Sequence, residues 1–468
     1  MDWNHFQEPS IEGAPGIWSL EDALAYRAQG KWPTIPATVP AWVKRGPDNT
    51  LPDMQIDWTI GKGWIDGKPY STLDAVRRVG NGSYSRASDA WGYGPDKALK
   101  KFGPNVPRLV YDPVTGAALG YRAEGAATNL ITQSGGRDGT IGVVGSGGAL
   151  PTGWGAVAAL GLTVEVLATN IDPVIGGCRV RISGTPTSSG VFRMQCSNAV
   201  GRQATDPGVV ASCFVRGIAG AGNGLINLVN ASSGSTPSFN LFDGMPTLAA
   251  ARRLGVGAGT TASALTVRQE FRFTASSGVP VDMTIEIGGA QIEVGSFPTS
   301  YIETTTAAAQ RLADSLSFAR AGTPEGTVVI RGRTAAGIGG GSVSQTLFHW
   351  GLGTTSNANR IVVVRNTAKN IVAVVTVGAV EAARITSPFT VGDNTDLAAA
   401  LSFKSGQIAL AVDGNAPQVI TSYAGPMPDL SDFMVGTTWN KAEWYGTIAS
   451  MRILPKAYDP AQLPGMLS

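Results

Sequence analysis

The sequence predicts a mainly β protein, with two tandem jelly-roll β-sandwiches after an irregular, Trp- and Pro-rich N-terminal region with short helices. Gly is abundant, with 61 among 468 residues, and 28 Pro accompany it. From about residue 106, short runs of alternating apolar and polar residues recur, broken by Gly, Pro, Ser and Asn, as in antiparallel sandwiches. Seven of the 11 Trp precede residue 105. The chain therefore divides near that position.

The composition excludes several classes of protein. Hydrophobic residues make up 43% of the chain and charged residues 15%, which provides cores and argues against disorder. The Gly residues have no three-residue period, so collagen is excluded. The net charge is +2 and no long basic run occurs. We therefore expect no nucleic-acid partner.

No targeting or membrane segment is apparent. The sequence has no apolar stretch of about 18 residues of the kind that spans a membrane. The first ten residues, MDWNHFQEPS, lack a basic start followed by an apolar run, which a secretory signal peptide requires. We expect synthesis in a bacterial cytoplasm without a signal peptide, and no membrane insertion.

Cysteine and histidine usage limits the chemistry. Cys178, Cys196 and Cys213 are odd in number and lack CxxC spacing, which fits neither a disulfide framework nor a zinc site. Buried free thiols are the expected state. With only His5 and His349 in the chain, a His-rich metal site is excluded and histidine catalysis is disfavoured.

The N-terminal region, 1–105, has little continuous periodicity. A helix is predicted over 19–30, with Ser19 as N-cap and Gly30 as its end, and a second over 72–79. The segment between them is Pro-rich and reads as extended. Scattered aromatic side chains suit a segment that lies on another protein. The Trp residues expected to dock are Trp3, Trp18, Trp32, Trp42 and Trp58. The alternative is a small irregular domain packed on the next one.

Two sets of strands follow. In the region 106–305 the predicted strands are 162–168, 178–182, 191–197, 211–216, 265–273 and 281–287. A polar stretch, 303–310, links this set to the region 312–468. There the predicted strands are 326–333, 345–351, 360–366, 370–377, 396–404, 407–414, 432–438 and 445–454. Turns are predicted at 404–406 and 413–415, and a short helix at 460–467 closes the second sandwich.

Two stretches resemble one recurrent module of phage tail-fibre and spike proteins. The stretch PRLVYDPVTGAALGYRAEGAATNL (107–130) is similar to its opening, and GAQIEVGSFPTSYIETT (289–305) to its closing strand. The resemblance implies a carbohydrate-binding-module-like jelly roll over about 106–305. The usual aromatic-rich continuation is replaced here by QSGGRDGTIGVVGSGG (133–148).

The C-terminal strands resemble a second family. LSFKSGQIALAVDG (401–414) and WYGTIASMRILPKAYDPAQLPGML (444–467) are similar to the concanavalin A-like, laminin-G-type jelly roll. The stretch GIWSLEDALAYRAQGKWP (16–33) also resembles the openings of phage tail proteins. The superfold serves many functions, so the ligand does not follow from the fold.

These resemblances imply a virion fibre or spike subunit that attaches a phage or phage-like particle to host cell-surface polysaccharide. The region 1–105 would be the virion-anchoring part, in contact with capsid or tail proteins, and the protein would be a homo-oligomer. One alternative is a purely structural capsid or tail decoration protein, and a second is a polysaccharide depolymerase. The sequence leaves open which glycan is bound and whether head or tail carries the protein.

The sequence gives no positive indication of catalysis. Glycoside hydrolysis needs two carboxylates facing one sugar, and no paired carboxylate spacing of that kind occurs between Asp314 and Ser468. Glu286 and Glu293 flank a Gly–Gly bend and are interpreted as solvent-facing strand residues. A nucleophile elbow and a phosphate-binding loop are also absent. We therefore expect a non-enzyme.

For glycan recognition, aromatic side chains stack on sugar rings, and amides and Arg bond hydroxyls. The candidates are Trp350, Asn357, Arg360, Trp439 and Asn440, with Trp439 first. A core position for Trp350 is the alternative.

No cofactor is expected, and the one candidate metal site is for calcium. Asp393 and Asp396 precede a predicted strand and could offer oxygen ligands to a hard cation. An ordinary turn is the alternative.

Overall fold

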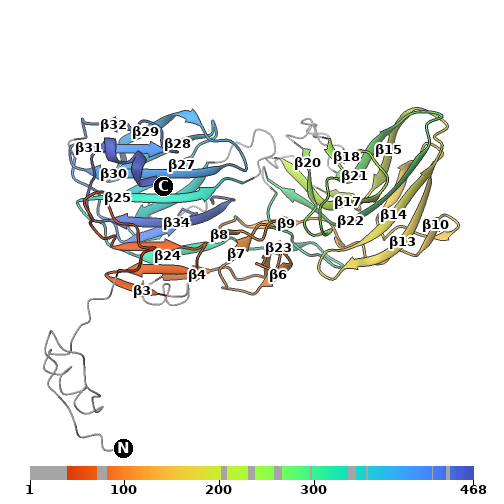
Figure 1. The fold of residues 1–468 in the computed structure, drawn as a ribbon, viewed down its shortest axis with the longest axis horizontal. Coiled ribbons are helices and arrows are strands. Elements are labelled where there is room, and N and C mark those ends of the chain that lie inside the picture. The colour runs from red at the N-terminus through yellow and green to blue at the C-terminus, as the bar shows by residue number, and fades with distance from the viewer. Residues whose placement is uncertain are drawn as a thin grey trace, which may run out of the picture.

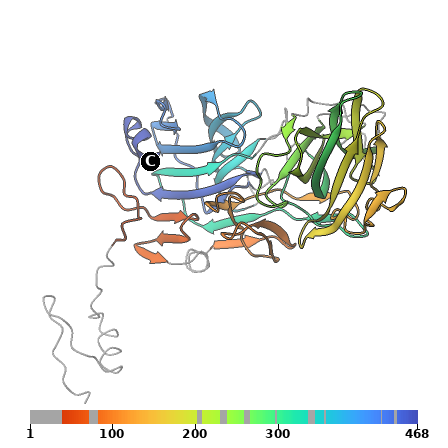
Figure 2. The ribbon, with the colours of Figure 1, turned by 45° about the vertical axis from the view of Figure 1, so that its right-hand side comes forward.

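The computed structural model describes residues 39–70, 82–201, 208–229, 238–257, 266–295, 298–335, 344–354, 357–423, 425–438 and 443–467. In this part of the chain almost all regular structure is β-strand, and the helices are two short 3-10 turns. Two β-sandwiches lie side by side with short strands between them (Figure 1, and turned in Figure 2). The predicted mainly β class is confirmed. The helices predicted at 19–30 and 72–79 lie outside the described residues.

The first sandwich has two antiparallel sheets. Its strands are β10 (Gly142–Val144), β11 (Gly147–Gly148), β12 (Gly155–Ala158), β13 (Thr163–Asp172), β14 (Gly176–Gly184), β15 (Gly190–Gln195), β16 (Val200–Gly201), β17 (Val209–Ala219), β18 (Asn223–Val229), β19 (Phe239–Asn240), β20 (Arg252–Gly257), β21 (Thr266–Ala275) and β22 (Val281–Val294). One sheet runs β11-β10-β13-β14-β22-β17-β20, and the other runs β12-β15-β21-β18-β19 with β16 beside β21. In the core between the two sheets, the rings of Phe192 and Phe273 stack with their centroids 4.7 Å apart. All six strands predicted for this region are present.

The second sandwich also has two large sheets. Its strands are β1 (Met54–Asp57), β2 (Lys62–Ile65), β3 (Lys68–Tyr70), β4 (Gly82–Ser85), β7 (Leu109–Tyr111), β8 (Ala118–Arg122), β24 (Ser315–Ala319), β25 (Glu325–Arg333), β26 (Gln345–Gly351), β27 (Arg360–Arg365), β28 (Asn370–Val377), β29 (Val380–Thr390), β30 (Asp396–Lys404), β31 (Gln407–Val412), β32 (Gln418–Ile420), β33 (Asp432–Val435) and β34 (Thr447–Leu454). One sheet, called sheet A below, runs β3-β2-β1-β34-β25-β30-β31-β32, with β8 on β34 and β7 on β8. The other runs β29-β28-β27-β26-β33-β24-β4.

Smaller elements complete the chain. They are the hairpin of β5 (Ala90–Tyr93) and β6 (Leu99–Phe102), the pair β9 (Ala127–Asn129) and β23 (Ala309–Arg311), and the 3-10 turns η1 (Pro460–Gln462) and η2 (Pro464–Leu467). The two 3-10 turns confirm the closing helix. The turn at 404–406 is confirmed, with Gly406 at φ +85°. In the region 312–468, strands β24, β29 and β32 were not predicted.

Strands from the N-terminal region belong to the second sandwich. β1 pairs with β34 and β4 pairs with β24, so residues more than 230 apart in the chain are hydrogen-bonded neighbours. Trp58 is buried in the shared core, its ring 5.8 Å from that of Tyr121. Part of the Pro-rich segment is therefore a three-stranded extension of sheet A.

A buried network of charged side chains holds the two sandwiches together. Asp314, between β23 and β24, accepts hydrogen bonds from Arg86 at 3.0 Å and from Arg108, and all three side chains are fully buried. Arg108 also binds Glu124 and the Ser300 hydroxyl, at 2.8 and 2.7 Å. The carboxylates of Asp314 and Glu124 raise the pKa of Arg108, although burial alone would lower it. Because the five residues come from five segments, the network fixes the junction.

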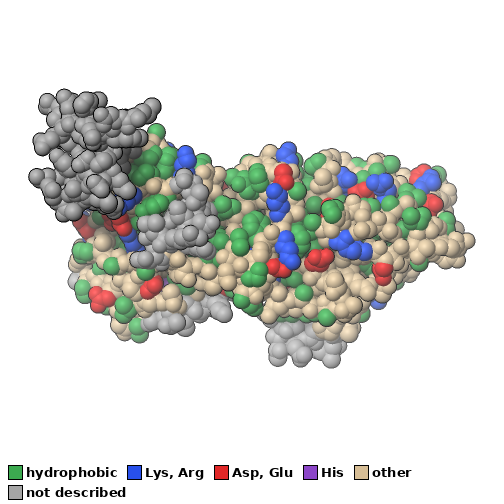
Figure 3. Space-filling model, turned by 90° about the horizontal axis from the view of Figure 1, so that it is seen from below, with side chains coloured by type: hydrophobic (Ala, Val, Ile, Leu, Met, Phe, Trp, Pro, Cys, Tyr) green, Lys and Arg blue, Asp and Glu red, His purple; other side chains and the backbone are tan. Residues whose placement is uncertain are grey.

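The outer face of sheet A is only half covered. Over one half, Leu463, Met466 and Leu467 of the C-terminal turns pack on Val329 and Ala400. Over the other half, toward β8 and the start of β30, the described residues leave a hollow. Seen from below in Figure 3, the visible charged side chains are scattered and of both signs. Among the described residues visible in that view, no continuous basic patch of the kind that nucleic acids require is present.

Candidate ligand-binding groove

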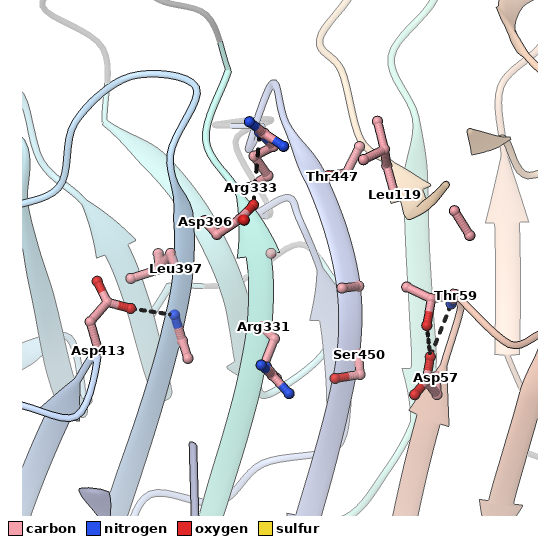
Figure 4. Close-up of a pocket in the computed structure, with 14 residues that line it drawn as sticks. Asp57, Thr59, Leu119, Arg331, Arg333, Asp396, Leu397, Asp413, Thr447 and Ser450 are labelled. Carbon is pink, nitrogen blue, oxygen red and sulfur yellow. Dashed lines mark hydrogen bonds and ion pairs between the residues drawn. The ribbon is translucent and has the colours of Figure 1, made fainter. Parts of the chain in front are cut away.

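The open half of sheet A is hollowed into a groove of about 480 Å³. Figure 4 shows it crossing β31, β30, β25, β34 and β1 in turn. Its polar lining residues are Asp57, Thr59, Arg331, Arg333, Asp396, Asp413, Thr447 and Ser450. The groove exists because β1 and β8 share one edge of β34, end to end: Asp57 pairs with Ser450 and Arg122 with Thr447.

Strand register places one transverse row of side chains across the groove. Asp57 lies opposite Ser450, Ser450 opposite Arg331, and Arg331 opposite Ala398. Ala398 in turn donates its N–H to Asp413 at 2.7 Å. Because residues such as Ile330 and Met451 face the core, these alternate residues face outward. Asp57 and Asp413 therefore stand on opposite sides of Arg331 (Figure 4).

A second row lies one pleat away. Arg122 pairs with Thr447, Thr447 with Arg333, and Arg333 with Asp396. The Arg333 Nε lies 3.8 Å from an Asp396 oxygen and 3.2 Å from the amide oxygen of Asn394. Arg333 is therefore held by its neighbours on β30 and the preceding turn.

The charged groups of the first row differ in their hydrogen bonds and burial. Asp57 accepts hydrogen bonds from the N–H and hydroxyl of Thr59, at 3.0 and 2.5 Å. Burial raises the pKa of Asp413, and the Asp396 carboxylate adds to it. Arg331 is exposed and has no hydrogen bond or ion pair with any described residue. It is a guanidinium free to bind a ligand.

A second hollow continues the groove toward the first sandwich. It has a volume of about 300 Å³ and shares Leu119, Arg333 and Thr447 with the groove. Pro298 of the first sandwich and Asp112 of the β7–β8 turn also line it. The concave surface therefore reaches the junction of the two sandwiches.

The predicted glycan-binding residues are not brought together. Trp350 is 1% exposed, its ring 5.5 Å from Phe433 and its Nε1 donating to the Arg320 carbonyl at 2.9 Å. It lies in the core and has no face for a sugar. Arg360 alternates with the core residue Ile361, so it points to the opposite side.

The other predicted site residues are placed as follows. Asn357 is half-buried, and Trp439 and Asn440 lie outside the described residues. Asp393 binds Arg365 at 2.6 Å and Lys369 at 2.8 Å, so two cations already engage its carboxylate. Asp396 faces Arg333 as described.

Of the predicted docking residues, two lie in the described part of the chain and three lie outside it. Trp42 is half-buried and Trp58 is 4% exposed. Trp58 is therefore a core residue without a ring face for another protein. Trp3, Trp18 and Trp32 lie outside the described residues.

The residues that carry the resemblance to the phage module are structural. Asn129 donates to the Ala290 and Ile302 carbonyls at 3.2 and 2.9 Å, and Glu293 binds Thr299. The interpretation of Glu286 and Glu293 as solvent-facing is wrong, since both are buried. Glu286 pairs with two arginines from flanking strands, so its charge is neutralised inside the sheet.

The groove was not predicted, although the sequence contains one signal for it. Arg331 and Arg333 alternate within the predicted strand 326–333, so both side chains had to lie on the face away from the core. The positions of Asp57 and Asp413 beside them depend on sheet order, which a single sequence does not give.

The three cysteines are buried thiols that form no disulfide in the described part of the chain, as predicted. No helix in the part of the chain that the structure describes is long and apolar enough to cross a membrane. Within the same residues, no group of three or more metal-ligating side chains occurs.

No family model matches the chain, and no curated protein matches it. Among solved structures, the CBM40 module of the Ruminococcus gnavus IT-sialidase bound to α2,3-sialyllactose is similar at 17% identity, covering 31% of this chain and 82% of that one, with a TM-score of 0.26. Domains LG4–5 of the mouse laminin α1 chain are similar at 12% identity, covering 58% and 89%, with a TM-score of 0.22. At these values the likeness concerns the fold alone.

Proposed function

We propose that this protein is a fibre or spike subunit on the surface of a phage or phage-like particle, and that it attaches the particle to polysaccharide on the host cell. The resemblance of 107–130 and 289–305 to a phage tail-fibre module supports the location. The groove on sheet A supports the activity, and the observation that carries it is the exposed Arg331 between two carboxylates on an otherwise open sheet face.

The groove offers what a polyhydroxylated ligand needs. Carboxylates of Asp57 and Asp413 accept hydrogen bonds from hydroxyl groups, and the Arg331 guanidinium donates several in one plane. Asp57 and Asp413 are four strands apart, which corresponds to about 19 Å at the usual strand spacing. That length suits a stretch of an extended sugar chain.

Binding rather than hydrolysis fits the separation of the carboxylates. Glycosidases hold their two carboxyl groups within roughly 10 Å of one another, far less than the separation of Asp57 and Asp413. Asp396 and Asp413 lie closer, and the raised pKa of Asp413 is the one observation that favours a depolymerase. If the purified protein releases new reducing ends from capsular polysaccharide, the non-enzyme proposal is wrong.

We place the particle-docking surface in the residues before the first strand and expect several copies on each particle. Individual sugar contacts are weak, and many copies multiply them. Deletion of residues 1–70 would remove Met54 and Ile56 from the shared core. Deletion of 1–38 leaves all described strands and is the better test. The shortened protein should keep polysaccharide binding but no longer incorporate into particles.

The decisive experiment replaces Arg331. Arg331→Ala should weaken binding to bacteria that carry surface polysaccharide by roughly tenfold to hundredfold, since charge-assisted hydrogen bonds contribute about 1.5–3 kcal/mol. Arg181→Ala is the matched control, because Arg181 is an exposed arginine on a strand of the first sandwich.

Bacteria without the polysaccharide should bind neither variant nor the parent protein. Equal binding of parent and Arg331→Ala protein would remove the groove as the site. No binding to any bacterium would favour the structural decoration role. Point variants are preferred to truncation after residue 305, because truncation strips β1 and β4 of their partners.

A further inference from the structure

We infer that the first sandwich carries a binding site for an oxyanion group, a carboxylate, sulfate or phosphate, on its outer face between Arg193 of β15 and Arg272 of β21. Strands β15, β21 and β18 are neighbours in one sheet of that sandwich (Figure 1). The groove on sheet A has no lining residue from this sheet, so the inference goes beyond the proposed function.

Strand register places the two arginines directly opposite one another. Arg193 pairs with Arg272, and Arg272 pairs with Leu225 on its other side. Their sequence neighbours Phe192 and Phe271 lie in the core, so both arginine side chains point to the outer face. The Cβ atoms of opposite residues in a sheet lie about 4.5–5.5 Å apart. Two guanidinium groups can therefore reach one anion.

The charge of Arg193 has no counter-ion among the described residues. Arg193 is half-buried and has no hydrogen bond or ion pair with any of them. Its cross-strand neighbours are Ala158 and Arg272. Like charges directly opposite one another destabilise a sheet, so this pair lowers the stability of the free protein. An anion between the two guanidinium groups would remove the repulsion.

The nearest carboxylate on this face, that of Glu270, is already bound by two arginines of its own strand. The Glu270 side chain is fully buried. The Arg268 Nε lies 3.2 Å from one of its oxygens, and the Arg272 Nε lies 2.9 Å from the other. Three arginines and one carboxylate leave an excess of positive charge on this face. Glu270 also fixes the orientation of the Arg272 guanidinium.

The other outer face of the same sandwich shows a compensated arrangement. There Glu286 lies in register between Arg179 and Arg216 and binds them at 2.7 and 2.8 Å. Arg181 binds Asp282 at 2.8 Å. Each of these arginines has a carboxylate partner, so that face provides the control for the experiment below.

An oxyanion suits the arginine pair better than a neutral ligand does. Guanidinium groups donate paired hydrogen bonds to carboxylate, sulfate and phosphate oxygens, and charge-assisted bonds are about twice as strong as neutral ones. A neutral sugar would leave the repulsion between the arginines in place. The oxyanion can be a free ion or a substituent of a polymer chain, and the experiment separates these two sources.

The probes are dextran sulfate, unmodified dextran and sodium sulfate, each with the full-length protein. At low salt, dextran sulfate should bind more tightly than dextran, because surface charges are then least screened. Arg193→Gln removes one charge and no contact with a described residue. It should weaken dextran sulfate binding roughly tenfold. Without any probe, its melting temperature should equal or exceed that of the parent protein, because the repulsion is relieved.

Three further measurements complete the design. Arg181→Gln removes the same charge from the other face and should change dextran sulfate binding by less than about twofold. Arg193→Glu should lose the binding and raise the melting temperature, because the new carboxylate lies opposite Arg272. Sodium sulfate should raise the melting temperature of the parent more than that of Arg193→Gln, the rise common to both being the general salt effect.

Equal weakening by Arg181→Gln and Arg193→Gln would indicate non-specific attraction and overturn the site. Weakening by Arg331→Ala beside unchanged Arg193→Gln would place the anion in the groove and also overturn it. A lower melting temperature of Arg193→Gln without probe would contradict the repulsion between the arginines. An Arg193-dependent effect of sodium sulfate without one of dextran sulfate would keep the site and assign the free ion to it.

Discussion

Asp314→Ala should destabilise the protein more than any other single change at the junction. The carboxylate of Asp314 accepts hydrogen bonds from the Tyr84 hydroxyl at 2.5 Å, from Arg86 at 3.0 Å, from the Glu124 N–H at 3.0 Å and from Arg108. All of these side chains are buried. Removal of the carboxylate leaves two buried guanidinium groups without their main counter-ion.

The expected loss in the free energy of unfolding follows from this burial. Breaking a buried ion pair by removal of one partner costs about 3–5 kcal/mol, because the remaining charge is uncompensated. The loss of the Tyr84 and Glu124 hydrogen bonds adds to it. Globular domains are stable by about 5–15 kcal/mol, so the variant should lose a large share of its stability.

Urea unfolding followed by tryptophan fluorescence measures the effect. Because the network joins the sandwiches, the variant should also unfold in two separated steps where the parent protein shows more cooperative unfolding. Asp96→Ala is the control: Asp96 pairs with Lys100 on the surface, where both side chains are about half exposed, and no measurable change is expected. A destabilisation by Asp314→Ala below about 1 kcal/mol would refute the role of the network.

Further predictions concern pH, the core, the thiols and one glycine. The pKa values of Asp314 and Glu124 are lowered, because the attraction of neighbouring arginines outweighs the opposing effect of burial. Their stabilisation is thus present above the unfolded pKa of about 4 and is lost as pH falls through the lower folded values, so an acid titration of fluorescence should show unfolding only below about pH 4. Trp350→Ala should cost about 3–5 kcal/mol in urea unfolding. Burial raises the pKa of Cys178 to about 12, so a thiol reagent should react with it in urea and not in buffer. Gly120→Ala should lower the melting temperature, since Gly120 has φ +106° and an added Cβ would lie 2.2 Å from the Ile448 carbonyl oxygen.

Local sequence pattern predicted the strands well where nearly every residue is buried. The strands 345–351, 370–377 and 396–404 have the predicted bounds, because their apolar side chains and flanking turn residues agree. β29 was missed although its buried residues alternate from Ala383 onward. Two of these buried residues are Ala383 and Ser387, whose small side chains give only a weak apolar signal.

The N-terminal region shows why strand β1 and the groove were not predicted. The strand β1, MQID, is too short to be recognised by itself, and its hydrogen-bond partners lie near residue 450. Pairing over such a distance leaves no trace in local propensity, since tertiary context decides it. The same holds for the groove, whose row of side chains combines residues near 57, 331, 413 and 450.

The choice of candidate ligand-binding residues was limited in the same way, because local sequence does not show which residues meet in the folded protein. A Trp in a strand is equally compatible with a core and with a sugar site, and for Trp350 the packing against Phe433 and Phe403 decides for the core. The alternation of the strand indicates that Arg360 points away from the core. Which residues lie beside it depends on sheet order, which the sequence does not give. Residue type alone therefore does not decide between a core position and a ligand site.

The two ends of the phage-module resemblance meet at the junction network, and this explains what those motifs do. Arg108 and Glu124 come from the opening stretch, and Ser300 from the closing one, and they bind one another in a fully buried cluster completed by Asp314. A buried charge is tolerated only when its partners are present, so loss of any one of these side chains should destabilise the cluster. The two stretches therefore couple one sandwich to the next through buried charge, and Leu119 of the opening stretch also lines the groove on sheet A.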